Sequence, residues 1–300
     1  MVPVVLGVTI LAFFLIHLIP GDPARTMLGV HATDEAISAL HKQWGLDKPL
    51  PVQYGLFMKR LATGDLGDSL FYRVPTSDLV KGRLAATLWL LGFGTILSVL
   101  IAVPLATLAA LRKDRLADQL VRVIPLVGLG MPQVWVGIML ILFLALKAHL
   151  FPVGGYGHGF PGHLKSMFLP SLSVALYLAP ILIRSLRASM LQVLESDYIA
   201  TARSKGIPER GVLTRHALRN AVISTVTVLG INIGFLVGTT VVIESVFALP
   251  GLGQLMIQAI FNRNFSVVQA ITLVYGVMVV LVYLATDVVY SLLDPRVRFD

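Results

Sequence analysis

The sequence contains no cysteine and few charged residues, which make up 13% of its 300 residues. The lack of cysteine excludes disulfide bonds and thiolate metal sites, and it leaves the cellular compartment open. A soluble domain of this size carries about twice that charged fraction. Because 56% of the residues are hydrophobic and the mean hydropathy is +0.82, we predict an integral membrane protein.

Several motifs of catalytic and energy-coupling sites are also missing. The sequence has no G-x-x-x-x-G-K-[ST] phosphate loop, no H-E-x-x-H, no G-x-S-x-G and no paired carboxylates within a hydrophobic run. A hydrolase is therefore not predicted, and any active transport must draw its energy from a source outside this chain. His149, His158 and His163 share a glycine-rich segment that has no acid and no recognised metal spacing, so we predict no metal site.

Six hydrophobic runs are long enough to cross a bilayer, which takes roughly 18 residues or more. They are residues 1–21, 84–111, 123–146, 166–183, 221–243 and 269–286. The first run lacks the basic start and the small-residue cleavage site of a signal peptide, so we expect a retained helix. The sequence thus predicts an all-α integral membrane protein with six transmembrane helices in a single domain, residues 1–300.

The distribution of basic residues predicts the orientation of these helices. A net charge of +8 can indicate nucleic-acid binding, but Lys and Arg of membrane proteins gather in short cytoplasmic loops, so no nucleic-acid partner is expected. Basic residues gather after the second, fourth and last hydrophobic runs. They are Arg112, Lys113, Arg115 and Arg122; Arg184, Arg187, Arg203, Lys205, Arg210, Arg215 and Arg219; and Arg296 and Arg298. The opposite short loops contain only Lys147, Lys165 and Arg263. We therefore expect both termini and residues 184–220 in the cytoplasm.

The long segment between the first two runs, residues 22–83, is expected to be a folded external insertion. Asp34–Trp44 has helical apolar spacing, an acidic start and Gly45 as its stop. Residues 52–62 form a second amphipathic pattern that stops near Gly64.

A basic segment, residues 197–221, separates the fourth and fifth runs. Residues 198–205 can form a short helix, which Gly206, Ile207 and Pro208 would end. Ala200 and Ala202 give this helix a small-residue surface that can fit a groove on a partner, while basic neighbours steer the approach. The alternative is a cytoplasmic loop that is only solvated.

This segment resembles the conserved cytoplasmic loop of binding-protein-dependent ABC transporter permeases, whose pattern is Glu-Ala-Ala, three residues, Gly, nine residues, Ile-x-Leu-Pro. Aligned on Gly206, the chain agrees at Ala202, Gly206 and Leu218. Its departures resemble those of one subgroup, the first permease subunit of dipeptide, oligopeptide and nickel importers (the dipeptide permease B type). Further marks of the subgroup are Pro20-Gly21-Asp22-Pro23, Gly64-Asp65-Leu66-Gly67, Met131-Pro132 with Trp135, Pro152-Val153, Arg187-Ala188-Ser189-Met190, Glu244-Ser245-Val246-Phe247, Pro250-Gly251-Leu252-Gly253 and Leu293-Asp294-Pro295-Arg296.

The resemblance implies a type I ABC importer permease fold in a bacterial cytoplasmic (inner) membrane. It implies a second homologous permease, two ATPase subunits or domains, an external solute-binding protein and membrane lipid as partners. The chain itself would bind no cofactor, because ATP and Mg²⁺ belong to the ATPase partners. Residues 184–220 would be the coupling loop, which meets the ATPase through Tyr198, Ala202, Arg203, Lys205, Gly206 and Ile207. The solute would be a dipeptide or oligopeptide, with haem, nickel chelates or glutathione as alternatives.

The fifth run is expected to line the solute path. On a helical wheel Thr225, Asn232 and Thr239 fall on one stripe, which we assign to the path together with Phe235. Three small residues fall nearly opposite and are expected to pack on a neighbouring helix; they are Gly230, Gly234 and Gly238. The alternative is that the polar side chains only make interhelical or backbone hydrogen bonds.

A different class of function, an ion-driven secondary transporter, requires an essential acid near the middle of the membrane. Glu244 and Asp287 are the acids nearest the membrane, and both lie near the ends of their runs. The sequence therefore favours the ATP-driven class.

Overall fold

The computed structural model describes residues 2–17, 24–25, 33–69 and 71–293. The predicted marks at residues 20–23 and 294–296 and the basic Arg298 lie outside this range. The chain divides into two compact units, Met1–Thr87 with Pro250–Val280 and Leu88–Leu249 with Leu281–Asp300. Two helices, α5 (Thr76–Leu111) and α13 (Phe265–Leu293), contribute residues to both units, and each unit is described by itself.

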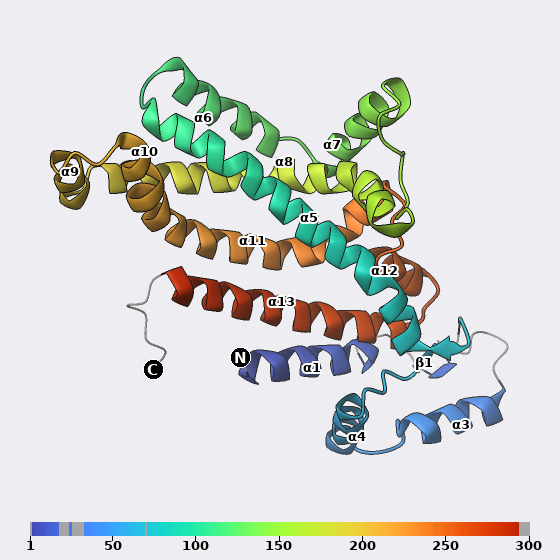
Figure 1. Ribbon diagram of the computed structural model, residues 1–300. Helices are drawn as coiled ribbons and strands as arrows, with labels where there is room; N and C mark the ends of the chain where they lie inside the picture. Colours follow the sequence, from blue (N-terminus) through green and yellow to red (C-terminus); the bar gives the residue numbers. More distant parts are fainter. Residues whose placement is uncertain (1, 18–23, 26–32, 70, 294–300) are drawn as a thin grey trace. The chain divides into compact units, whose positions relative to one another are not determined.

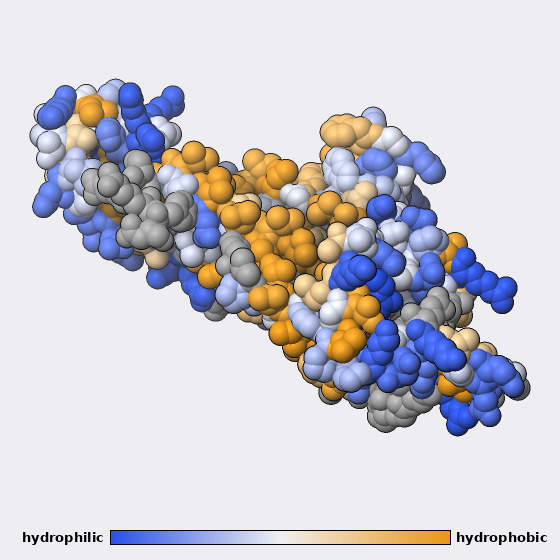
Figure 2. Space-filling view, turned by 90° about the horizontal axis from the view of Figure 1, so that it is seen from below, coloured by the Kyte–Doolittle hydropathy of each residue, from blue (hydrophilic) through white to orange (hydrophobic). Residues whose placement is uncertain are grey.

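The first unit combines hydrophobic helices with the predicted insertion. Its further elements are α1 (Val2–His17), α3 (Asp34–Trp44), α4 (Leu50–Ala62), β1 (Asp68–Ser69), β2 (Val74–Pro75) and α12 (Leu252–Phe261). The two short strands form an antiparallel hairpin in which Asp68 lies opposite Pro75. On the face seen in Figure 2, hydrophobic side chains gather over α1 and the adjoining part of α13, and hydrophilic side chains gather over α3 and α4.

Local sequence signals set the ends of the insertion helices. Thr33 caps α3, since its Oγ1 accepts a hydrogen bond from the Ala36 amide at 3.2 Å. Gly45 at φ +69° and Gly64 at φ +75° follow α3 and α4 in the left-handed conformation that glycine adopts without a steric penalty. The bounds of α3 are those that the sequence predicted, and α4 begins two residues before the predicted residue 52.

Aromatic and aliphatic side chains of α1, α4 and α13 form the core of the first unit. Phe13, Phe57 and Leu273 are buried there, and the rings of Phe13 and Phe57 lie 5.9 Å apart. Two polar contacts reinforce this packing: the Thr9 and Tyr54 hydroxyls lie 2.9 Å apart, and α13 reaches α1 through a bond from Gln269 Nε2 to the Ala12 carbonyl at 3.0 Å. The insertion is therefore docked on hydrophobic helices of its own unit.

The second unit is built around one long helix, α8 (Gly159–Leu194), which packs against α6, α7 and α11 (Figure 1). The other elements are α6 (Leu116–Leu129), α7 (Gln133–Leu140), the π-helix η1 (Ile141–Lys147), α9 (Asp197–Ser204), α10 (Glu209–Gly211), the π-helix η2 (Val212–Leu218) and α11 (Arg219–Val246). Small residues bring the helices together. A Cβ added at Gly94 of α5 would lie 2.8 Å from a methyl group of Val174 in α8.

Within the described ranges, four helices are long and apolar enough to cross a membrane, namely α5, α8, the continuous stretch Glu209–Val246 and α13. The predicted all-α membrane fold is confirmed, with the short β-hairpin as its exception among the described residues. The predicted span 123–146 is wrong as a continuous helix. It is interrupted at Pro132, which has φ −58° and ψ 134° and precedes α7. The first span is present as the shorter α1.

The ten-residue α12 was not predicted. Its apolar run is too short to be recognised as a membrane span. The helix is tied to the first unit by its Leu252 amide, which donates to Thr87 Oγ1 at 2.9 Å.

Candidate coupling region and solute path

The predicted coupling segment is helical over most of its length. The helix α8 ends at Leu194 rather than at the predicted residue 183, so the base of the segment extends the long helix. The short helix α9 follows after Ser196, with Ile199 and Ala202 buried and Tyr198 and Arg203 exposed. Since one face of α9 is packed and the other is open, this helix can present a defined surface to a partner.

Gly206 closes α9 in the way that the sequence predicts. Its φ is +75°, and its amide bonds to the Arg203 carbonyl at 2.9 Å. The next amide, of Ile207, bonds to the Ala202 carbonyl at 3.3 Å, which completes a Schellman motif. A Cβ at Gly206 would meet no atom within 4 Å, so the requirement for glycine comes from the backbone conformation rather than from crowding.

An ion pair spans the turn that follows. Arg203 Nη2 lies 2.7 Å from Glu209 Oε1, and Arg203 Nε lies 3.2 Å from Oε2. The hydrogen bond to Glu209 raises the pKa of Arg203 above its ordinary value. Both side chains are about half exposed, so the pair adds little stability but holds α9 and α10 in one orientation. Lys205 remains exposed beside it.

The chain returns to the membrane through α10 and η2, which run without interruption into α11. Tyr198 of α9 accepts a hydrogen bond from Asn220 Nδ2 of α11 at 3.3 Å. Val212 and Ala217 of η2 are buried. These contacts connect α9 to α11, while the chain itself connects α9 to α8, so a displacement of α9 acts on both long helices.

A buried ion pair fastens α6 to the C-terminal part of α8. Arg187 Nη2 donates to Asp118 Oδ2 at 2.7 Å, and Arg187 Nε donates to Asp118 Oδ1. The Asp118 side chain is fully buried and also accepts from the Asp114 amide at 3.0 Å. The Arg187 guanidinium holds the pKa of Asp118 below its ordinary value. The sequence indicated for Arg187 only a contribution to charge asymmetry, because a partner 69 positions away leaves no local pattern.

The predicted stripe on α11 does not stay on one face. Thr225 is buried and bonds to the Ala221 carbonyl, Asn232 is half-buried and donates to the Val228 carbonyl at 2.7 Å, and Thr239 is exposed. Seven-residue spacing falls about 20° short of two turns, so the stripe drifts around the helix. The open face instead contains Ser224, Thr227, Ile231, Phe235, Thr239, Val242 and Ser245, of which the sequence identified Phe235 and Thr239.

The three glycines of α11 differ in their surroundings. A Cβ at Gly230 would overlap the Thr286 side chain of α13, and one at Gly234 would lie 2.9 Å from the Tyr283 hydroxyl oxygen. Gly238 is exposed, and a Cβ there would meet nothing within 4 Å. Gly230 and Gly234 therefore lie where α11 approaches α13, and Gly238 lies on the open face.

Two adjoining cavities lie between α6, α7 and α8, and the sequence did not indicate them. One, of about 750 Å³, is lined mainly by apolar groups that include Trp135, Met139 and Phe143. The other, of about 620 Å³, is lined by Arg122, Arg184 and Arg187 among others. They share residues such as Pro125 and Pro180. Each has a volume typical of small-molecule pockets.

Comparisons with known proteins agree with this architecture. Residues 1–74 match the family described as the N-terminal part of the binding-protein-dependent transport system membrane component. The chain is 36% identical to the dipeptide transport system permease protein DppB of Alkalihalophilus pseudofirmus, with 100% of this chain and 97% of that protein covered. It is 34% identical to the glutathione transport system permease protein GsiC of Salmonella paratyphi A, with 100% and 96% covered.

The fold is that of a solved ABC transporter chain. The similarity to the MetNI methionine ABC transporter in an inward-facing conformation has a TM-score of 0.59 at 17% identity, covering 72% of this chain and 96% of that chain. This likeness confirms the predicted type I permease fold. Residues 102–299 match the family described as the binding-protein-dependent transport system inner membrane component, and the chain belongs to that family.

Proposed function

We propose that this chain is the permease subunit of an ATP-driven importer of dipeptides or oligopeptides, and that it forms half of the translocation path. The observation that carries the proposal is α9, a short helix with an exposed face between two long apolar helices. Full-length similarity to proteins named as dipeptide and glutathione permeases supports a solute of peptide character.

In this proposal two ATPase partners bind ATP and Mg²⁺ and move α9 from the cytoplasmic side. Tyr198, Arg203, Lys205 and the end of the helix at Gly206 and Ile207 form the contact. The buried Ala202 anchors α9 to its own chain. Both termini lie in the cytoplasm of a bacterial host, and the chain sits in the inner membrane.

The contacts at the base of α8 would transmit a displacement of α9 to the long apolar helices. Because Arg187 ties α8 to α6, and Tyr198 ties α9 to α11, these helices respond together to a displacement of α9. The open face of α11, with Phe235 and Thr239, would meet a second homologous permease across the solute path. An external solute-binding protein would deliver the solute to the opposite end.

Uptake by intact cells tests the substrate. A labelled non-hydrolysable dipeptide, glutathione, haem and nickel are each supplied to cells that lack this chain and to cells in which it is restored. Uptake of the dipeptide alone, dependent on the chain, supports the proposal. Chain-dependent uptake of glutathione, haem or nickel instead would keep the ABC architecture and replace the substrate. Uptake that persists without ATP and collapses with the ion gradient would overturn the ATP-driven mechanism.

The contact with the ATPase is tested at Gly206. Replacing Gly206 with valine forces a β-branched residue to φ +75°, which costs about 1–2 kcal/mol and distorts the end of α9. We expect transport per ATP hydrolysed to fall about tenfold while the protein stays in the membrane at normal abundance. Gly206→Asn is the matched control, since asparagine tolerates this conformation and should retain most of the uptake. Normal uptake by the valine variant would contradict the proposed role.

A further inference from the structure

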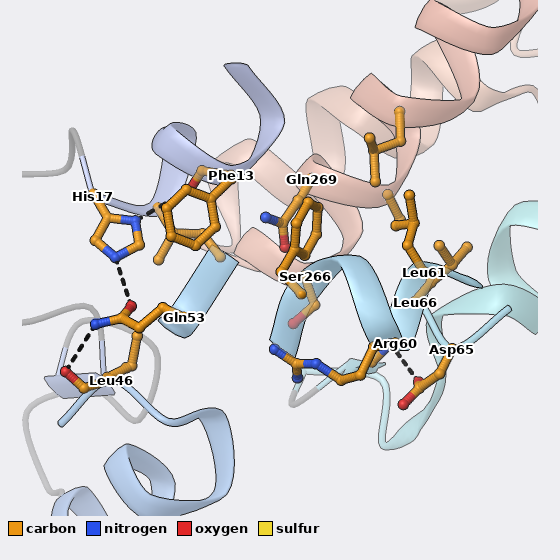
Figure 3. A pocket seen from close by; sticks show the side chains of 15 residues that line it. Phe13, His17, Leu46, Gln53, Arg60, Leu61, Asp65, Leu66, Ser266 and Gln269 are labelled. Carbon is orange, nitrogen blue, oxygen red and sulfur yellow. Dashed lines mark hydrogen bonds between the residues drawn. The ribbon is translucent and has the colours of Figure 1, made fainter. Parts of the chain in front are cut away.

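A small cavity with both apolar and polar lining lies within the first unit, where α1, α4 and α13 meet (Figure 3). Its volume is about 40 Å³, room for roughly three water-sized groups. Polar side chains from all three helices line it, together with residues of the turn after α4. The polar lining residues are His17, Gln53, Arg60, Asp65, Ser266 and Gln269.

His17 is held in place at the edge of the cavity by two hydrogen bonds. The Gln53 amide nitrogen donates to the carbonyls of Leu46 and Lys48 at 3.2 and 2.7 Å, which fixes its Oε1 as the atom that faces His17. His17 Nε2 lies 2.9 Å from that Oε1, and His17 Nδ1 lies 3.2 Å from the Phe13 carbonyl (Figure 3). Both ring nitrogens of His17 are therefore engaged within the first unit.

Arg60 provides a positive charge on α4. Its guanidinium makes no ion pair or hydrogen bond with the residues that the structure describes, although it lines the cavity. Asp65 is the acid in the lining, and its Oδ1 already accepts from the Gly67 amide at 2.8 Å. Arg60 therefore brings to the cavity a positive charge that no acid of the described chain pairs with.

The beginning of α13 offers unused donors to the same cavity. Ser266 is 2% exposed, and its hydroxyl has no hydrogen-bond partner among the described residues. Asn264, just before the helix, turns its Nδ2 to Ser69 Oγ at 2.6 Å, and its Oδ1 is also without a partner in the described chain. Asn264 therefore does not cap the first amides of α13, and the positive end of this 29-residue helix stays available.

We propose that this cavity binds a carboxylate group, which Arg60 and the Ser266 hydroxyl would hold, with the start of α13 favouring the anion. Three heavy atoms fill the available volume, so the carboxylate enters and the rest of its molecule stays outside. The approach from the external side rests on the proposed function. The carboxylate belongs either to the solute, as the C-terminus of a peptide, or to an acidic side chain of the delivering protein.

The first test uses the full-length chain, purified with the subunits that accompany it. Its unfolding temperature is measured in sodium acetate and in acetamide, the neutral molecule of the same shape, at matched ionic strength. At pH 6 we expect acetate to raise the unfolding temperature by about 2–4 °C relative to acetamide. Equal unfolding temperatures in the two solutions would overturn the proposal.

Variants test whether acetate raises the unfolding temperature by binding in this cavity. Arg60→Gln and Ser266→Ala should each abolish most of the acetate response. Lys59→Gln, an exposed charge next to Arg60 and outside the cavity lining, is the matched control and should leave the response unchanged. A response that survives Ser266→Ala, the least disruptive of these changes, would contradict the site.

Uptake distinguishes the two sources of the carboxylate. If it belongs to the solute, Ser266→Ala lowers uptake of a dipeptide and not of its C-terminal amide. If it belongs to the delivering protein, the variant lowers uptake of both. Unchanged uptake of both would overturn a role in transport. Absence of chain-dependent uptake in unmodified cells would instead contradict the proposed function and leave the acetate result standing.

Discussion

The helices α8 and α11 are similar in sequence character and opposite in environment. Their most hydrophobic windows have mean hydropathies of 1.9 and 2.1, yet 72% of the window is buried in α8 and 28% in the helix that contains α11. The slightly less hydrophobic helix is therefore the one at the centre of its unit. Hydropathy identifies helices that can enter a membrane, but it does not identify which of them the others surround.

Side-chain size and hydrogen bonding explain better than hydropathy why α8 is buried and α11 is largely exposed. In α8 the small residues Ser171, Ser173 and Ala175 are buried at close helix contacts. In α11 the exposed face combines hydroxyl groups with Phe235, which is 71% exposed. Hydroxyl groups are poorly suited to contact with lipid, so this face suits a protein partner or a wet path.

The largest loss of stability is expected from breaking the ion pair between Asp118 and Arg187 at the base of α8. Asp118→Ala removes the fully buried partner of Arg187, whose own side chain is 16% exposed, and breaking a buried pair typically costs about 3–5 kcal/mol. Unfolding of the purified protein in denaturant measures the loss. Glu195→Gln is the matched control, since it breaks the exposed pair with Lys113 and should leave stability close to normal. Equal losses in the two variants would contradict the contrast between buried and exposed pairs.

Two matched truncations compare the helices directly. Leu178→Ala in α8 removes a fully buried side chain and should cost about 2–5 kcal/mol. Phe235→Ala in α11 should change stability by less than about 0.5 kcal/mol, because its ring is exposed within this chain. We expect the second variant to lower uptake even so. A large loss of stability in the isolated Phe235→Ala chain would show that this face is packed.

The smallest expected effect is the contribution of Asp118 to the pH dependence of the free energy of unfolding. The pKa of Asp118 is depressed in the folded protein by Arg187, so the folded state binds fewer protons at this site than the unfolded chain. The stabilisation is complete above the ordinary pKa of an aspartate, about 4, and is lost as the pH falls further. Denaturant unfolding between pH 6 and pH 3 should show a steeper loss in the unmodified protein than in Asp118→Asn. If stability falls with pH equally steeply in the two proteins, Asp118 does not contribute to the pH dependence.

The features that the sequence predicted correctly are those with local causes. The insertion helix α3 has both its expected bounds because Thr33, the acidic first turn and Gly45 act within a few residues of each end. The helix α9 and its stop at Gly206 follow from the same kind of local signal. Four of the six hydrophobic runs are long helices, because hydropathy depends on composition alone.

The features that the sequence missed depend on contacts between distant segments. The pairing of Asp118 with Arg187 and the cavity shared by His17, Arg60 and Ser266 arise only when the helices pack. The solute-path assignment on α11 stays a prediction. The structure adds that a seven-residue repeat drifts around the helix, so that over 14 residues Thr225 is buried within the chain while Thr239 is exposed.

The interruption between α6 and α7 determines where water is needed. Peptide groups that leave a helix lose their regular partners, and a bilayer interior offers no replacement, so such a break persists only where protein or water supplies hydrogen bonds. Here Gly130, Met131 and Pro132 are all exposed within the chain. The neighbourhood of Pro132 should therefore be a hydrated pocket inside the hydrophobic thickness, with backbone amides that exchange their hydrogens faster than those of α8.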